Sequence, residues 1–219
     1  MAPTAGVNLH NSVKLIKQAG KEINALVTMI KNDINSEIEK VQLGCNAYIH
    51  GRGWYEESHL DDENYVYELY SEVLPLQKTK RNRNEAQRFL MIQVSLDGDG
   101  MTHEEANNHE PLIHIALWDE PINLNNEQYI SLHLSEADSF TIQENVLLNW
   151  YPEAESWTEQ SWTYSLTLTS LNTPKDIQDK VIKPIRALMK KGDPLSAGLD
   201  KLDGIVRYKL LRDGGLQVM

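Results

Sequence analysis

The chain has 219 residues and a formal net charge of -11, from 21 lysines and arginines against 32 aspartates and glutamates. Its composition, with 41% hydrophobic and 24% charged residues, is that of a globular protein and excludes a disordered chain. The sequence has no apolar run as long as a secretory signal or a membrane span, and its single cysteine, Cys45, excludes an internal disulfide. We therefore expect a cytoplasmic protein without membrane contact, folded as one domain over residues 1–219.

Residues 11–41 are predicted to form one long amphipathic helix, with Asn11 as its N-cap and Gly44 as its stop. Apolar residues recur at spacings of three and four along it: Ile16, Ala19, Ile23, Leu26, Ile30, Ile34, Ile38 and Val41. We expect this stripe to pack on the rest of the protein, because no coiled-coil charge pattern accompanies it. Its length also permits a homodimer through residues 11–41.

The middle of the chain, residues 60–172, alternates apolar and polar residues, as half-buried strands do. The predicted strands are 65–73, 88–96, 111–118, 128–135, 142–150 and 161–169. Short connections rich in turn residues join them, so we expect an antiparallel sheet of about five to seven strands, connected as a meander. The preceding stretch GWYEESHLDDENY, residues 53–65, is predicted to be a loop.

Residues 173–219 are predicted to form a second helix and a short hairpin. Thr173 is a helix N-cap, and Pro174 follows at the first helical position. Pro184 lies inside the helical pattern, where its ring removes one backbone donor and crowds the carbonyl of Lys180, so we expect a kink. The chain is therefore predicted to be an α+β protein, with its long N-terminal helix and its C-terminal helix packed on one face of the antiparallel sheet.

The second face of the predicted sheet carries uncharged polar residues. If 111–118 and 128–135 form a hairpin, their aliphatic residues share the buried side, and His114 and His133 lie together on the other side. We expect this face to be open as a binding surface for a protein or a neutral ligand, or covered by another segment or a second subunit. The two histidines would need at least one further ligand to hold a metal ion.

Residues 89–174 contain fourteen acidic residues and no lysine or arginine. Such a block repels nucleic acid, anionic membranes and phosphorylated substrates, and it attracts a basic protein surface or divalent cations. Its alternative role is that of an acidic surface that only aids solubility. The basic cluster KTKRNRNEAQR, residues 78–88, is predicted to be a solvated turn.

Aromatic and acidic residues alternate in NWYPEAESWTEQSW, residues 149–162, as expected of an interface for a basic partner. The alternative for Trp150 and Trp162 is a place in the core, which we favour for Trp162. The predicted interaction residues are Trp150, Tyr151, Glu153, Glu155, Trp157, Glu159, His114 and His133.

The stretch SLDGDGMTHEEA, residues 95–106, resembles a calcium-binding loop at first sight. Asp97 and Asp99 fit the third and fifth positions of an EF-hand loop, but Ala106 replaces the bidentate glutamate, and a strand precedes the loop where a helix is required. We expect a tight turn between strands. Weak metal binding by Asp97, Asp99, Glu104 and Glu105 remains as the alternative.

The sequence contains no glycine-rich phosphate loop, GxSxG elbow, HExxH or paired CxxC motif, and we expect no cofactor. The first functional prediction is a non-enzymatic acidic interaction module of the immunity-protein, inhibitor or adaptor type, which binds a basic partner surface. One alternative is a metal- or small-ligand-dependent enzyme that uses His114, His133 and the acidic loop 97–110. Another is a structural subunit that oligomerises through the N-terminal helix.

Overall fold

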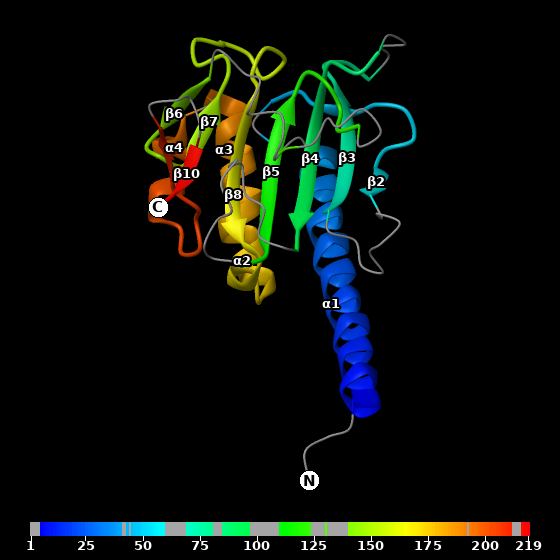
Figure 1. Ribbon diagram of the computed structural model, residues 1–219. Helices are drawn as coiled ribbons and strands as arrows, with labels where there is room; N and C mark the ends of the chain where they lie inside the picture. The colour runs from blue at the N-terminus through cyan, green and yellow to red at the C-terminus, as the bar shows by residue number, and fades with distance from the viewer. Residues whose placement is uncertain are drawn as a thin grey trace.

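The computed structural model describes residues 5–40, 43, 45–59, 69–80, 85–96, 110–123, 130, 140–191, 193–211 and 216–219. These residues form an α+β structure, as predicted, in which α1, Ala5–Glu39, and the C-terminal helices cover one face of an antiparallel sheet (Figure 1). The C-terminal helical elements are η2 Leu168–Ser170, α2 Pro174–Ile177, the π-helix η3 Gln178–Ile182, α3 Lys183–Lys191, α4 Pro194–Ala197 and η4 Leu199–Lys201.

Within the described residues the main sheet has eight strands in the order β1-β3-β4-β5-β8-β7-β6, with β2 also paired to β3. The strands are β1 Tyr48–Ile49, β2 Tyr55–His59, β3 Leu69–Gln77, β4 Arg88–Ser95, β5 Leu112–Trp118, β6 Thr141–Gln143, β7 Leu147–Asn149 and β8 Trp162–Thr167. A separate hairpin joins β9 Tyr208–Leu210 to β10 Leu216–Val218. All these pairings are antiparallel.

The face toward the helices holds the larger core, because the strands present apolar residues there in register. Leu74, Leu90, Leu117 and Trp162 form one such row across four neighbouring strands. Trp162 is fully buried, as predicted.

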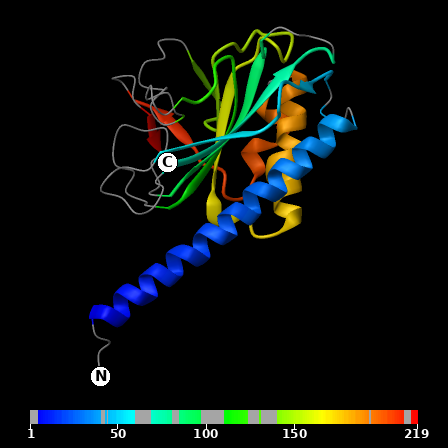
Figure 2. The same cartoon turned by 90° about the vertical axis from the view of Figure 1, so that its right-hand side faces the viewer.

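Helix α1 begins at Ala5, earlier than the predicted Asn11, and ends at Glu39. Its C-terminal half packs on the sheet through the predicted stripe, with Ile30, Ile34 and Ile38 buried, and Val27, which the prediction did not include, is buried beside them. By contrast, residues 6–22 are all exposed, and this half of the helix projects beyond the sheet (Figure 2).

Several predicted strands were wrong in pairing or extent. The hairpin between 111–118 and 128–135 does not form, because β5 is paired to β4 on one edge and to β8 on the other. This pairing also breaks the predicted meander. Segment 142–150 is a hairpin and not one strand, since Glu144 and Asn145 adopt positive φ angles between β6 and β7. Part of the predicted loop 53–65 is strand β2.

The C-terminal helical segment starts as predicted, with a complete capping box between Thr173 and Asp176. A kink or a split was predicted at Pro184, and the structure has a π-helical turn there, η3, which ends immediately before α3. Because Pro184 has no N–H for the carbonyl of Lys180, that carbonyl needs another donor. The buried Tyr164 hydroxyl supplies it, at 3.2 Å from Lys180 O and 3.4 Å from Val181 O.

The second face of the sheet is covered in the structure, so the prediction of an open face was wrong. A second apolar cluster lies on it, and β9 and β10 contribute Tyr208 and Leu216 to this cluster. The predicted hairpin required Ile130 to lie on the helix side, with the aliphatic residues of β5. Ile130 is instead buried in this second cluster, on the opposite face. Another segment of the same chain therefore covers the face, which was the alternative.

Candidate functional site

The connection between β7 and β8, residues 150–161, lies at the end of the sheet toward which β5 runs, opposite the projecting half of α1 (Figure 1). The loop is held at its base, because Trp150 N–H donates to Ser161 O at 3.0 Å. Arg88, the first residue of β4, donates a hydrogen bond from Nε to Gln160 O at 2.9 Å. In the middle of the loop, Trp157 is only 5% exposed and belongs to the larger core. The loop is thus fixed on the sheet by a buried ring.

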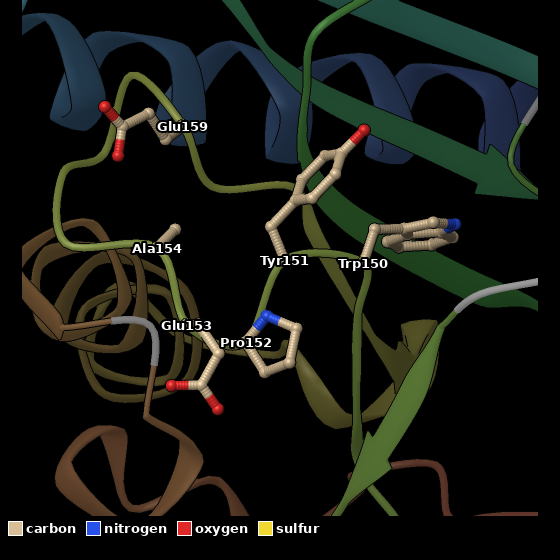
Figure 3. Close-up of a pocket in the computed structure, with 6 residues that line it drawn as sticks. All are labelled: Trp150, Tyr151, Pro152, Glu153, Ala154 and Glu159. Atoms are coloured by element: carbon tan, nitrogen blue, oxygen red, sulfur yellow. The ribbon is translucent and has the colours of Figure 1, made fainter.

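The outer side of this loop encloses a shallow surface hollow of about 410 Å³, lined by Trp150, Tyr151, Pro152, Glu153, Ala154 and Glu159. Tyr151 is 50% exposed, whereas Trp150 is partly covered by an edge-on contact with Trp118 at a centroid distance of 5.9 Å. In Figure 3 the rings of Trp150 and Tyr151 lie near each other, whereas the carboxylates of Glu153 and Glu159 lie apart from each other, on either side of Ala154. Aromatic and acidic side chains thus both line the hollow.

Further acids lie at the same end of the sheet, because antiparallel β5 ends beside the start of β8. We name the exposed residues Asp119, Glu120, Tyr151, Glu153, Glu155 and Glu159 the acidic end. Arg88 interacts electrostatically with three residues of the acidic end, namely Asp119, Tyr151 and Glu159. Burial lowers the pKa of its guanidinium from the ordinary value, and these three residues partly oppose that shift. One guanidinium beside the five carboxylates of the acidic end compensates only part of their charge.

The structure brings together most of the predicted interaction residues of the loop, but it corrects Trp157. The carboxylates of Glu153, Glu155 and Glu159 are exposed, and Tyr151 is the exposed aromatic residue among them. Trp157 was predicted as a surface contact and is a core residue. Aromatic and acidic residues in one short segment indicate an exposed loop, but they do not reveal which ring the loop uses as its anchor.

His114 was predicted on an open face, and this was wrong, whereas its predicted neighbour His133 lies outside the described residues. The cross-strand neighbours of His114 are Gln93 and Ser165, and its side chain is fully buried. His114 Nδ1 lies 2.7 Å from Ser165 Oγ, which also accepts a hydrogen bond from the Tyr208 hydroxyl at 3.0 Å. This buried polar row joins the sheet to the hairpin that covers it.

The row continues across the sheet through Gln93, whose side-chain oxygen accepts the backbone N–H of Ile130 at 3.0 Å. The next neighbour, Ser71, is also fully buried. Alternation places these residues on one face, but their burial depends on segments distant in the sequence. The polar row is therefore a structural connection under a covering segment, and it presents no surface to a partner.

The remaining predicted ligands, Asp97, Asp99, Glu104, Glu105 and His133, lie outside the described residues, so the cation-binding loop stays a prediction. Among the residues that the structure describes, no group of three or more histidine, cysteine or acidic side chains is placed to hold a metal ion.

Sequence reasoning missed the contribution of Asp119 and Glu120 to the acidic end. Both residues follow strand 111–118 directly, so the sequence places them at one end of that strand. Placing them beside loop 150–161 also requires knowing which strand is paired with 111–118. With β8 beside β5, the loop that precedes β8 reaches the same end of the sheet.

No family model, curated protein sequence or solved structure matches this chain. Over the described part of the chain, no helix is both long and apolar enough to cross a membrane. The function is therefore argued from the residues of the chain itself.

Proposed function

We propose that the protein is a non-enzymatic interaction module that binds a basic surface of a partner protein through the acidic end, as an inhibitor, immunity protein or adaptor does. The observation that carries the proposal is the half-exposed Tyr151 beside a hollow that is bordered by exposed carboxylates. The surrounding 86 residues, 89–174, contain no lysine or arginine that could neutralise a larger part of this surface.

The chemistry of the acidic end fits a lysine or arginine side chain of a partner. The apolar stem of such a side chain can lie in the hollow, and its cationic head can lie against the Tyr151 ring or a carboxylate. Glu153 and Glu159 line the hollow, and Glu155 is exposed in the same loop. A rigid loop presents these groups without a large ordering cost, since Trp157 fixes it to the core.

The enzyme alternative has weaker support from the geometry. It uses His114 with His133 and the acidic loop 97–110, and His114 is fully buried, so this histidine is not accessible to a substrate. His133 and most of the loop lie outside the described residues.

The proposal is tested by binding of an arginine-rich peptide to the full chain, measured by fluorescence anisotropy at low and at high salt. The variant E153Q/E155Q/E159Q removes three exposed charges without changing side-chain size. We expect it to weaken binding about tenfold and to reduce the salt dependence, because each exposed ion pair contributes only a fraction of a kcal/mol to about 1 kcal/mol.

A matched control separates the local site from the overall charge. The variant E22Q/E39Q/E144Q removes the same number of exposed charges away from the hollow. We expect it to bind the peptide nearly as the natural chain does, and we expect Tyr151→Ala to weaken binding without changing its salt dependence. Equal losses in both triple variants would show that only net charge matters, and the proposal would then be abandoned.

A further inference from the structure

The projecting half of α1, residues 6–22, carries an apolar stripe that has no counterpart in the described structure. Leu9, Val13 and Ile16 are exposed, and they continue the line of Ile23, Val27 and Ile30, which packs on the sheet. The spacing along this line alternates between four and three residues, as in the seam of a coiled coil. We call residues 6–22 the arm.

Two glycines lie on the same line, Gly6 and Gly20. Glycine destabilises the interior of a helix relative to alanine, so the presence of a glycine at each of these positions needs an explanation. At both positions an added Cβ meets no atom within 4 Å, so packing within the chain does not explain them. Glycines on a helix face permit the close approach of a second helix or of a bulky side chain.

The arm gains no stability from tertiary packing, because all of its residues are exposed. Most helical stability in proteins comes from packing of the apolar face. The arm is extended from the packed half of α1, but its own apolar residues gain nothing from that extension while they remain in water.

We propose that the arm pairs with the arm of a second copy of this chain in antiparallel orientation. A parallel partner is blocked, because from Val27 onward the sheet already occupies the apolar side of the helix. An antiparallel partner overlaps the arm and the partly buried Ile23 that follows it, and its own sheet then lies beyond the N-terminal tip of the first helix. The arrangement is two-fold symmetric, as closed homodimers usually are.

The antiparallel register also explains the two glycines. When Val13 of one arm faces Ile16 of the other, Gly20 faces Leu9, and Gly6 faces Ile23. Each large residue then lies opposite a glycine or a medium-sized residue, which is how well-packed layers interdigitate. The paired length is about 25 Å for the seventeen residues of the arm, at about 1.5 Å per residue.

The positive charge of the arm distinguishes pairing with a second arm from docking on an acidic surface. Lys14 and Lys21 lie on the helix face away from the stripe, and Lys17 lies at its flank. Pairing of two arms brings these like charges nearer, so salt should strengthen the dimer by screening them. Docking of the arm on an acidic surface would instead be weakened by salt.

The proposal is tested by sedimentation equilibrium of the full chain from about 1 µM to about 1 mM. We expect a monomer–dimer equilibrium that Ile16→Asp weakens at least about a hundredfold, because both copies lose a buried aliphatic residue and gain a charge in the seam. The matched control is Leu15→Asp, which changes a side chain that is 70% exposed but off the stripe, whereas Ile16 is 46% exposed and on it. The control should dimerise as the natural chain does.

Orientation is tested by disulfide exchange between two single variants, Leu9→Cys and Gly20→Cys. Antiparallel arms should give the mixed disulfide in preference to the Leu9→Cys homodimer. A chain that is monomeric over the whole range overturns the proposal. A dimer insensitive to Ile16→Asp, or one weakened by salt, does so as well. None of these variants alters the acidic end, so this test and the peptide-binding test fail independently.

Discussion

The hydrogen bonds of Tyr164 lead to a prediction about Pro184. The proline cannot donate to the carbonyl of Lys180, and the Tyr164 hydroxyl bonds that carbonyl and the next one, Val181 O, from β8. Burial raises the pKa of Tyr164, so the hydroxyl remains a neutral donor at all ordinary pH values. Tyr164→Phe therefore leaves buried carbonyls without this donor, and we expect a loss of about 1–3 kcal/mol in the free energy of unfolding.

The loss should be smaller when residue 184 can donate. In Pro184→Ala the new backbone N–H is in position to bond Lys180 O in an ordinary α-helical turn. We expect the cost of Tyr164→Phe to fall by about 1 kcal/mol in this background, which a double-mutant cycle measures as a coupling free energy. Urea unfolding followed by tryptophan fluorescence is a suitable assay, because the chain contains five tryptophans.

A second tyrosine provides the control for this cycle. Tyr208 is equally buried, and its hydroxyl bonds Ser165 on the other face of the sheet. The cost of Tyr208→Phe should be the same with and without Pro184→Ala. If the Tyr164→Phe cost also agreed in the two backgrounds within about 0.3 kcal/mol, the link between the proline and the tyrosine would be refuted.

Three further predictions concern packing and protonation. Gly204→Ala should lower the free energy of unfolding by more than about 2 kcal/mol, because φ is +79° and the added Cβ would lie 2.3 Å from a side-chain carbon. Gly198→Ala, where φ is +67° but the space around the added Cβ is open, should lower it by only about 1 kcal/mol in the same urea assay. Trp157→Ala should cost about 3–5 kcal/mol by urea unfolding, and Tyr151→Ala less than about 0.5 kcal/mol; equal costs would contradict the anchoring role. A side-chain hydrogen bond from the N-cap threonine lowers the pKa of Asp176, so its stabilisation is present above the unfolded-state pKa and lost as pH falls through the folded-state pKa. Asp176→Asn should therefore lower the melting temperature at pH 6 and flatten its decrease between about pH 4 and pH 2, and parallel curves for the two proteins would contradict this.

The candidate site was predictable only in part. Exposed acids alternate with aromatic residues in the loop before β8, and this pattern indicated an interaction surface. Which ring faces solvent was not predictable, because Tyr151 and Trp157 have the same kind of neighbours in the sequence. The role of Trp157 follows from the depth of the core beneath the loop, and that depth depends on the helices packed below it.

Local physical chemistry determined much of this protein from the sequence alone. The spacing of apolar residues in α1, the N-cap at Thr173 and the alternation in β8 depend on residues within one or two turns or along one strand, and the structure confirms them. The acidic block is likewise a property of the sequence.

Only the tertiary structure decided which elements meet. Alternation places His114 on the face opposite the helices, but it does not say whether a distant hairpin covers that face. Strand order is decided by the combined burial of all elements, so β5 pairs with β8 and not with the nearer segment 128–135. The same holds for α1, whose stripe has one pattern throughout although the sheet covers only its C-terminal half. The physical reason is that burial is a property of the assembled layers, whereas periodicity is a property of each element by itself.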